Sequence, residues 1–199
     1  PSAAHRSILR WEIDMAKRDK NPATGDPTAG NAGGGASAGD SPSDKHELLH
    51  FALQVDDGWP PIATESAWAE RLEGNHLKVS NVPFFAVGVS CGDVVEAERN
   101  ADGGWQFARV ATPGGHSTVR LLVPDKDGLQ DIVDELVDLG CAFEGTYIEQ
   151  MVAVDVPPGV DYGEVRRWLD TQEDSGALEY EEGNLSPAHA EAGRVKTLH

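Results

Sequence analysis

Four residues of chemically reactive types lie in a glycine-rich part of the sequence: Cys91, Asp93, His116 and Ser117. His116 follows two glycines, which places its ring at a loop tip or at the entrance of a strand. A histidine in such a position can act as a general base near neutral pH. Asp93 could orient the imidazole, and Ser117 or Cys91 could act as the nucleophile. These residues are therefore the candidate catalytic set of a hydrolase-like enzyme, although no GxSxG signature accompanies them.

Each of these residues also has a structural interpretation, which we favour. His116 and Ser117 can close a turn, and Asp93 can accept hydrogen bonds from backbone amides or pair with Arg120. Cys91 has the character of a small buried residue, because a reactive thiol needs an electropositive setting. The sequence alone therefore commits no residue to a catalytic role.

The sequence predicts neither a metal site nor a cofactor site. Cys91 and Cys141 lie in no CxxC pair and beside no histidine at ligand spacing. HxH, HExxH and EF-hand spacings are missing, and no phosphate loop with the required lysine follows a strand. Two cysteines in an ordinary composition are typical of a reducing compartment, so a cytoplasmic location is expected.

The charge balance narrows the classes of partner. The chain has 16 Lys and Arg against 34 Asp and Glu, a formal net charge of −18. This balance argues against nucleic acid, whose phosphates need a basic face, and against anionic membrane surfaces. It favours a basic protein or peptide as partner, for example a toxin that the chain neutralises. The chain also has neither an apolar run of the roughly 20 residues that a membrane helix needs nor a signal peptide at its start.

An aromatic stretch, residues 81–95, suggests where a partner could bind. In an extended strand, neighbouring side chains point to opposite faces, so Phe84 and Phe85 would serve two surfaces. One of these surfaces could be the interface between the two folded halves of the chain, or the aromatic residues could line a groove that binds a peptide or small ligand. The leading hypothesis is a non-catalytic binding or interaction protein, and the hydrolase is the alternative. The expected binding residues are Asn81, Phe84, Phe85, Asp93, His116 and Arg120.

The elements that must position these residues fall into four segments. Residues 1–45 end in a Pro, Gly, Ala and Ser-rich stretch that cannot bury a core, and they are expected to be a disordered leader and linker. Residues 46–116 alternate apolar and polar side chains between tight turns, which predicts a small bent sheet or partly open barrel. In this half, residues 81–95 are expected to form a bent strand, with Gly88 and Gly92 at the bends.

Residues 117–183 show a different pattern, in which strands alternate with two amphipathic helices. The first helix should begin at Asp127 as a capping residue, and the second should be capped by Asp161 and end at Gly176. The order β-α-β-β-α-β predicts a ferredoxin-like half, so the fold class is α+β. Residues 184–199 lack periodicity and are expected to be a tail.

Several motifs in order resemble one known family. They are Asn-Val-Pro-Phe-Phe at 81–85, Gly-Asp-Val-Val at 92–95, Gly-His-Ser-Thr at 115–118 and Val-Asp-Val-Pro-Pro-Gly at 154–159. Together they resemble the uncharacterised bacterial domain-of-unknown-function family numbered four-two-six-five, which is common in actinobacteria. The resemblance extends from about His46 to Glu182 and leaves out the N-terminal extension. It implies a cytosolic bacterial protein and carries no activity with it.

Overall fold

The computed structural model describes residues 46–101, 103–145, 148 and 150–195 of the chain. All of them belong to one compact unit, His46–His199. The leader and linker predicted at 1–45 lie outside the described residues. Within the described part, no helix combines the length and the apolar character needed to cross a membrane.

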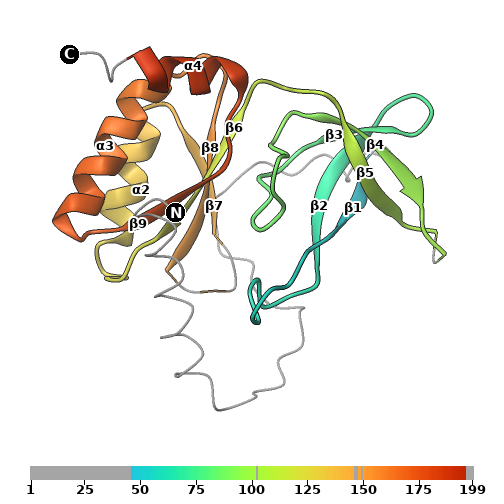
Figure 1. Cartoon of the computed structure of the whole chain (residues 1–199), viewed down its shortest axis with the longest axis horizontal. Helices are drawn as coiled ribbons and strands as arrows, with labels where there is room; N and C mark the ends of the chain where they lie inside the picture. The colour runs from blue at the N-terminus through green and yellow to red at the C-terminus, as the bar shows by residue number, and fades with distance from the viewer. Residues whose placement is uncertain (1–45, 102, 146–147, 149, 196–199) are drawn as a thin grey trace, which may run out of the picture. The chain divides into compact units, whose positions relative to one another are not determined.

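The first half of this unit is a closed barrel of five strands (Figure 1). Successive strands pair in antiparallel fashion, and the first strand closes the barrel by pairing with the fifth in parallel. Alternate apolar residues such as Leu49, Leu77 and Trp105 fill its interior. The barrel confirms the predicted β-rich half, and it is closed instead of partly open. Its strands are β1 (His46–Ala52), β2 (Thr64–Arg71), β3 (His76–Val79), β4 (Val94–Arg99) and β5 (Trp105–Thr112).

The second half is a four-stranded antiparallel sheet covered by two helices. The sheet order is β7-β8-β6-β9, and Figure 1 shows α2 and α3 side by side on the same face of the sheet. Buried residues of the strands and helices, including Val119, Leu136 and Leu169, form its core. The elements of this half follow the predicted order β-α-β-β-α-β. Its elements are β6 (Ser117–Leu122), α2 (Leu129–Asp138), β7 (Ala142–Gly145), β8 (Met151–Val156), α3 (Tyr162–Ser175) and β9 (Glu179–Asn184).

The helix ends confirm two predictions and correct a third. Asp161 caps α3 by accepting a 2.9 Å hydrogen bond from the amide of Gly163, and Gly176 ends α3 in the left-handed conformation. The expected cap of α2 at Asp127 is wrong, because Gly128 is the capping residue and makes no side-chain cap. The amide of Asp127 is instead bound by Asp125 at 3.0 Å, in the turn that precedes the helix.

The predicted tail at 184–199 contains a helix, α4 (Pro187–Val195). Pro187 stands at the first helical position, where a missing amide hydrogen costs nothing. The hydroxyl of Ser186 accepts a 3.3 Å hydrogen bond from the amide of His189, as a capping residue does. The helix is too short for its apolar pattern to have been evident in the sequence.

Residues 80–93, which we call the joining loop, replace the strand predicted over 81–95. Pro83 and two glycines with positive φ prevent regular strand geometry. The buried carboxylate of Glu65 accepts hydrogen bonds from the amides of Phe84, Phe85 and Ala86. On the barrel side, one carboxylate therefore holds three successive amides of the loop.

The joining loop also contacts the second half. The amide of Val82 donates a 3.0 Å hydrogen bond to Glu144 of β7, and the hydroxyl of Ser90 lies 2.9 Å from that of Thr118 on β6. The loop therefore connects the barrel to the sheet through specific polar contacts.

Candidate functional site

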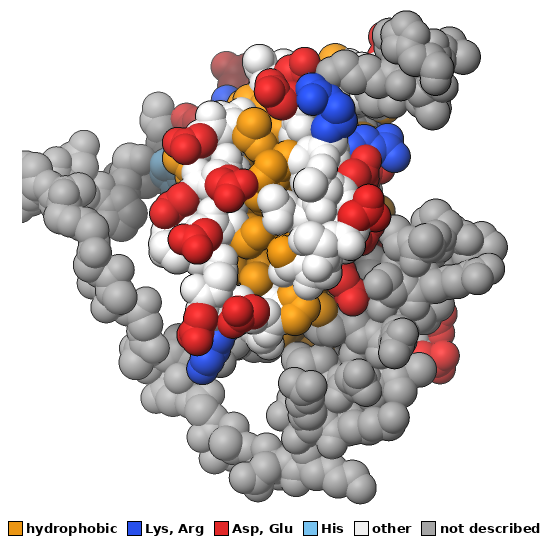
Figure 2. Space-filling view, turned by 90° about the vertical axis from the view of Figure 1, so that its left-hand side faces the viewer, with side chains coloured by type: hydrophobic (Ala, Val, Ile, Leu, Met, Phe, Trp, Pro, Cys, Tyr) orange, Lys and Arg blue, Asp and Glu red, His pale blue; other side chains and the backbone are white. Residues whose placement is uncertain are grey.

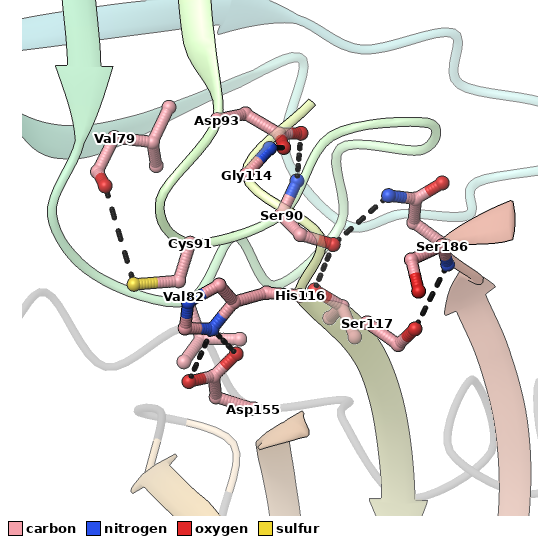
Figure 3. Close-up of polar contacts among 12 residues, drawn as sticks. Val79, Val82, Ser90, Cys91, Asp93, Gly114, His116, Ser117, Asp155 and Ser186 are labelled. Atoms are coloured by element: carbon pink, nitrogen blue, oxygen red, sulfur yellow. Dashed lines mark hydrogen bonds and ion pairs between the residues drawn. The ribbon is translucent and has the colours of Figure 1, made fainter. Parts of the chain in front are cut away.

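Three side chains converge where the joining loop meets the sheet. The sulfur of Cys91, a ring nitrogen of His116 and a carboxylate oxygen of Asp155 lie within 4.8 Å of one another. His116 Nδ1 lies 2.8 Å and 3.0 Å from the two oxygens of Asp155. Figure 3 shows this carboxylate facing the ring, with Cys91 on the neighbouring turn. We call these three residues the Cys–His–Asp site.

Strand β8 determines the position of Asp155. Its neighbours Val154 and Val156 pack into the helix-covered core, so the side chain between them projects from the opposite face of the sheet. Thr118 is the residue of β6 that pairs with Asp155, and His116 therefore enters the sheet beside the carboxylate. Asp155 is only 6% exposed, so its hydrogen bond to His116 is largely protected from water.

Asp93 positions Cys91 indirectly, through hydrogen bonds to neighbouring backbone amides. Its carboxylate accepts hydrogen bonds from the amide of Ser90 at 2.9 Å and from the amide of Gly114 at 2.6 Å. The first bond closes the turn that carries Cys91, and the second ties this turn to the segment that leads into His116. The predicted role of Asp93 as the group that orients His116 belongs to Asp155 instead.

Gly92 allows the turn to approach the histidine ring. A Cβ atom added at Gly92 would lie 2.9 Å from Cδ2 and 3.1 Å from Nε2 of His116. Only a residue without a side chain fits this contact, and its φ of 80° also favours glycine. The ring edge that carries Nε2 therefore faces the Cys91–Gly92 backbone, while Nδ1 faces Asp155.

The structure separates Ser117 from His116. The Ser117 hydroxyl lies 2.7 Å from His189 Nδ1 and accepts a 2.9 Å hydrogen bond from the amide of Ser186. Ser117 is completely buried. Neighbouring residues of a strand point to opposite faces, so His116 and Ser117 diverge. Ser117 therefore fixes α4 to the sheet and does not form the predicted pair with His116.

Arg120 does not pair with Asp93. Its guanidinium forms a 2.9 Å ion pair with Glu181 and donates to the carbonyl oxygens of Phe84 and Phe85 at 3.3 Å and 3.5 Å. Arg120 is buried, because it lies on the face of β6 that the joining loop covers. It holds the joining loop from the side opposite Glu65.

Of the other predicted binding residues, Phe84 and Phe85 are buried and Asn81 is partly buried. Phe84 and Phe85 are 8% and 5% exposed, and Phe85 packs edge-on against Trp59. Asn81 accepts a hydrogen bond from the amide of Trp68 at 2.7 Å and donates to Glu144 at 3.1 Å. In the structure these residues build the junction of the two halves and do not line an open aromatic groove.

Carboxylates dominate the electrostatics of the Cys–His–Asp site. Burial raises the pKa of Asp155, and the hydrogen bond to His116 acts in the opposite direction. Burial, with Asp155 and Glu144 nearby, raises the pKa of the Cys91 thiol to about 11. The thiol is therefore protonated at neutral pH and requires a base or a cation to lose its proton.

The arrangement supports two kinds of chemistry. Asp155 holds Nδ1 of His116, so Nε2 is the ring nitrogen available to accept the thiol proton, as in nucleophile–base–carboxylate enzymes. Sulfur, imidazole nitrogen and carboxylate oxygen are also the three donor types that bind zinc in proteins.

The sequence prediction included Cys91 and His116 but missed Asp155. The available signal was an acidic residue between valines in a fully buried strand, Met-Val-Ala-Val-Asp-Val. A carboxylate in such a strand needs a partner. The partner's identity depends on the pairing of β6 with β8, which the sequence does not state.

A family comparison covers the whole site. Residues 65–180 match the family described as a domain of unknown function, DUF4265. The chain belongs to this family. The matched range contains all three residues of the Cys–His–Asp site and extends from β2 into β9.

Comparisons beyond the DUF4265 family concern only the fold. No curated protein matches the chain. A crystal structure of a hypothetical protein from Neisseria gonorrhoeae is similar, with a TM-score of 0.61 and 21% sequence identity over 70% of this chain and 95% of the other. At this level of identity, the similarity concerns the arrangement of elements and not an activity.

Proposed function

We propose that this DUF4265 protein is a cysteine-dependent hydrolase that acts on an acyl bond. One observation supports the proposal most strongly. His116 Nδ1 is 2.8 Å from a buried carboxylate, and the thiol of Cys91 lies within 4.8 Å of the donor atoms of both residues. Cys91 and His116 are both partly exposed, so a substrate can reach them.

The proposed reaction has two steps. Nε2 of His116 takes the proton of Cys91 as the sulfur attacks the carbonyl carbon, which forms a carbon–sulfur bond. The same proton then passes from His116 to the leaving group as its bond to carbon breaks. Water hydrolyses the thioester with His116 again as base, which releases the acid and restores the thiol. Asp155 holds the ring and stabilises the imidazolium in both steps.

The raised pKa of Cys91 constrains this mechanism. A thiol with a pKa of about 11 is neutral in the resting site, so proton removal must accompany attack. The thiolate formed is a strong nucleophile, because sulfur nucleophilicity rises with pKa. The carboxylates of Asp155 and Glu144 disfavour an anionic group next to the bond that is cleaved. The proposed substrates are therefore neutral or cationic esters and thioesters.

The test measures acyl transfer to Cys91. The full chain is incubated with p-nitrophenyl acetate and with an acetyl thioester, and peptide mass mapping locates the acetyl group. We expect acetylation at Cys91, which Cys91→Ala abolishes and which Asp155→Asn slows by roughly 10²-fold or more. Cys141→Ser is the matched control, because the other cysteine is buried elsewhere. Acetylation that persists in Cys91→Ala, or that spares Cys91 in the unmodified protein, would overturn the proposal.

A second candidate function is binding to a basic protein, such as a toxin. The supporting observation is the exposed side of α2 and α3. Figure 2 shows an apolar stripe along this side with acidic side chains on both flanks. Val137 is 50% exposed there, and Asp131, Asp134 and Asp138 of α2 are exposed. This pattern suits a partner with basic residues around an apolar centre.

The test of this second function compares two forms of the chain. The unmodified chain and Asp131→Asn/Asp134→Asn/Asp138→Asn are used as baits at physiological salt in extract of the native host. We expect a basic protein to bind only the unmodified form. Equal recovery by both forms would contradict a role for this face. The accompanying proposal is an actinobacterial, cytoplasmic protein, supported by the motif resemblance and by two free cysteines.

A further inference from the structure

The Cys–His–Asp site brings three different donor atoms together from three separate elements. Cys91 lies on the joining loop, His116 directly precedes β6, and Asp155 lies on β8. From these contacts we infer that Cys91 Sγ, one ring nitrogen of His116 and one carboxylate oxygen of Asp155 bind a divalent transition-metal ion, with Zn²⁺ the best match.

The distances require little adjustment for this ion. Zinc bonds of about 2.0–2.3 Å place the ligand atoms of a tetrahedral site about 3.3–3.6 Å apart. In the structure the three atoms lie within 4.8 Å of one another. We assign the remaining movement to Cys91, whose sulfur makes a long 4.0 Å contact to the carbonyl oxygen of Val79. The inference requires a rotation of this short side chain to close the gap.

The charges also fit a divalent cation. A Cys91 thiolate and the Asp155 carboxylate carry two negative charges, which one Zn²⁺ neutralises. Glu144 adds a further carboxylate near the sulfur, and Lys78, the nearby lysine, is exposed. Arg120, the buried cation of the junction, is already paired with Glu181. A metal ion therefore supplies positive charge that the surrounding side chains do not.

The donor set selects the class of metal. A thiolate and an imidazole favour Zn²⁺, Co²⁺ and related ions over Mg²⁺ and Ca²⁺, which prefer oxygen ligands. Three protein ligands leave a fourth position for water. The side chains of His116 and Asp155 are 24% and 9% exposed, so an ion can enter from solvent on the His116 side.

Metal binding has a consequence that rests on the proposed hydrolase function. An ion held by the Cys91 thiolate and by His116 removes both the nucleophile and the base from the reaction. Zn²⁺ should therefore inhibit acetylation of Cys91, and a chelator should restore it. Binding of the ion itself does not depend on any hydrolase activity.

The test is a Co²⁺ titration of the full chain after treatment with a chelator and its removal. We expect one Co²⁺ per chain, with the visible bands of a tetrahedral ion and a near-ultraviolet sulfur-to-cobalt band, all displaced by Zn²⁺. Cys91→Ser should lose the sulfur-to-cobalt band. His116→Gln and Asp155→Asn should each weaken binding by about tenfold or more. Cys141→Ser and His76→Gln are the controls and should titrate like the unmodified chain.

A measurement on the unmodified protein guards against variants that misfold. One equivalent of Zn²⁺, but not Mg²⁺, should slow alkylation of Cys91 by iodoacetamide, as located by peptide mass mapping. A sulfur-to-cobalt band that survives in a folded Cys91→Ser, or alkylation of Cys91 unaffected by Zn²⁺, would overturn the inference.

The acetylation assay on metal-free protein separates the two proposals. Co²⁺ binding without acetylation would support the metal site and reject the hydrolase. Acetylation of Cys91 in a chain that gives no Co²⁺ spectrum would do the reverse.

Discussion

Gly92 is the residue on which the approach of Cys91 to His116 depends. We expect Gly92→Ala to destabilise the fold by about 1–2 kcal/mol, because its left-handed backbone disfavours a side chain. The added methyl group would also meet the His116 ring at 2.9 Å. The variant should therefore lose Cys91 acetylation and Co²⁺ binding, as well as stability in a urea titration.

Gly103→Ala is the matched control for this prediction. Gly103 has a similar φ of 83°, and a Cβ atom there would meet nothing within 4 Å. Gly103→Ala should lose a similar amount of free energy of unfolding and should keep Cys91 acetylation and Co²⁺ binding. Equal behaviour of the two variants at Cys91 would show that the contact with His116 is unimportant.

At the residue scale, the sequence predicts which residues of the site are reactive better than it predicts their hydrogen-bond partners. Cys91 and His116 were candidates because their types are reactive. Asp93 was recognised as a residue that can bind amides, and it does so. The partner of His116 could not be inferred, because Asp155 becomes its neighbour only through the pairing of β6 with β8. Long-range pairing is specified by the whole core and not by a local motif.

Among the elements, the joining loop depends on Glu65 of β2. Glu65→Ala would leave the buried amides of Phe84, Phe85 and Ala86 without their acceptor. We expect a loss of about 2–3 kcal/mol in the free energy of unfolding, since unpaired buried donors are costly. Urea denaturation followed by tryptophan fluorescence measures it.

Glu70→Ala, on the more exposed part of the same strand, should change stability by about 0.5 kcal/mol or less. A loss as large as that of Glu65→Ala would mean that charge on β2, and not the amide contacts, stabilises the loop.

Helix α4 should become less stable in acid because of His189. Burial, followed by the nearby charge of His116, lowers the pKa of His189. Its ring also contacts Ser117 and stacks on Tyr162. With the folded pKa below the unfolded value of about 6.5, the unfolded chain binds more protons between these two values. The stabilising contribution is therefore present above pH 6.5 and is lost as pH falls through the folded pKa.

Urea midpoints measured from pH 8 to pH 5 test this expectation. His189→Gln should show a smaller loss on acidification than the unmodified chain, while His76→Gln, a control at a partly exposed histidine of the barrel, should retain the loss that His189 causes. Carboxylates such as Asp155 titrate in both variants, so the difference between the two curves isolates His189. An unchanged pH dependence in His189→Gln would contradict the assignment.

At the element scale, periodicity predicted most strands and both long helices. It failed for the joining loop, because apolar residues that pack a loop into a junction resemble those of a buried strand. It also failed for α4, a short helix in which His189 is the buried side chain among those that the structure describes. In both cases tertiary contacts, and not local pattern, determine the conformation.

For the whole molecule, Arg120 connects the sheet to the barrel. Arg120→Met should lower the free energy of unfolding by about 2–3 kcal/mol, because it removes the hydrogen bonds of a buried guanidinium to the joining loop and its pair with the partly exposed Glu181. We also expect the barrel and the sheet of this variant to unfold in two separate transitions. In a Trp168→Phe background, which removes the tryptophan of α3, tryptophan fluorescence reports on the first half, including Trp105 of the barrel core. Far-ultraviolet circular dichroism reports mainly on α2 and α3.

Arg109→Met is the control, because the pair of Arg109 with Glu96 is exposed and such pairs contribute about 0–1 kcal/mol. Coincident transitions in Arg120→Met would show that the halves are held together by other contacts.

The three residues of the Cys–His–Asp site lie far apart in the sequence, so they become available at different times while the chain is synthesised. Cys91 leaves the ribosome first, His116 follows, and Asp155 emerges only with β8, after the whole barrel and α2. An unfinished chain therefore carries the thiol without the carboxylate that orients its base. The proposed acyl transfer requires β8 to be paired with β6, so a nascent or truncated chain lacks the assembled site.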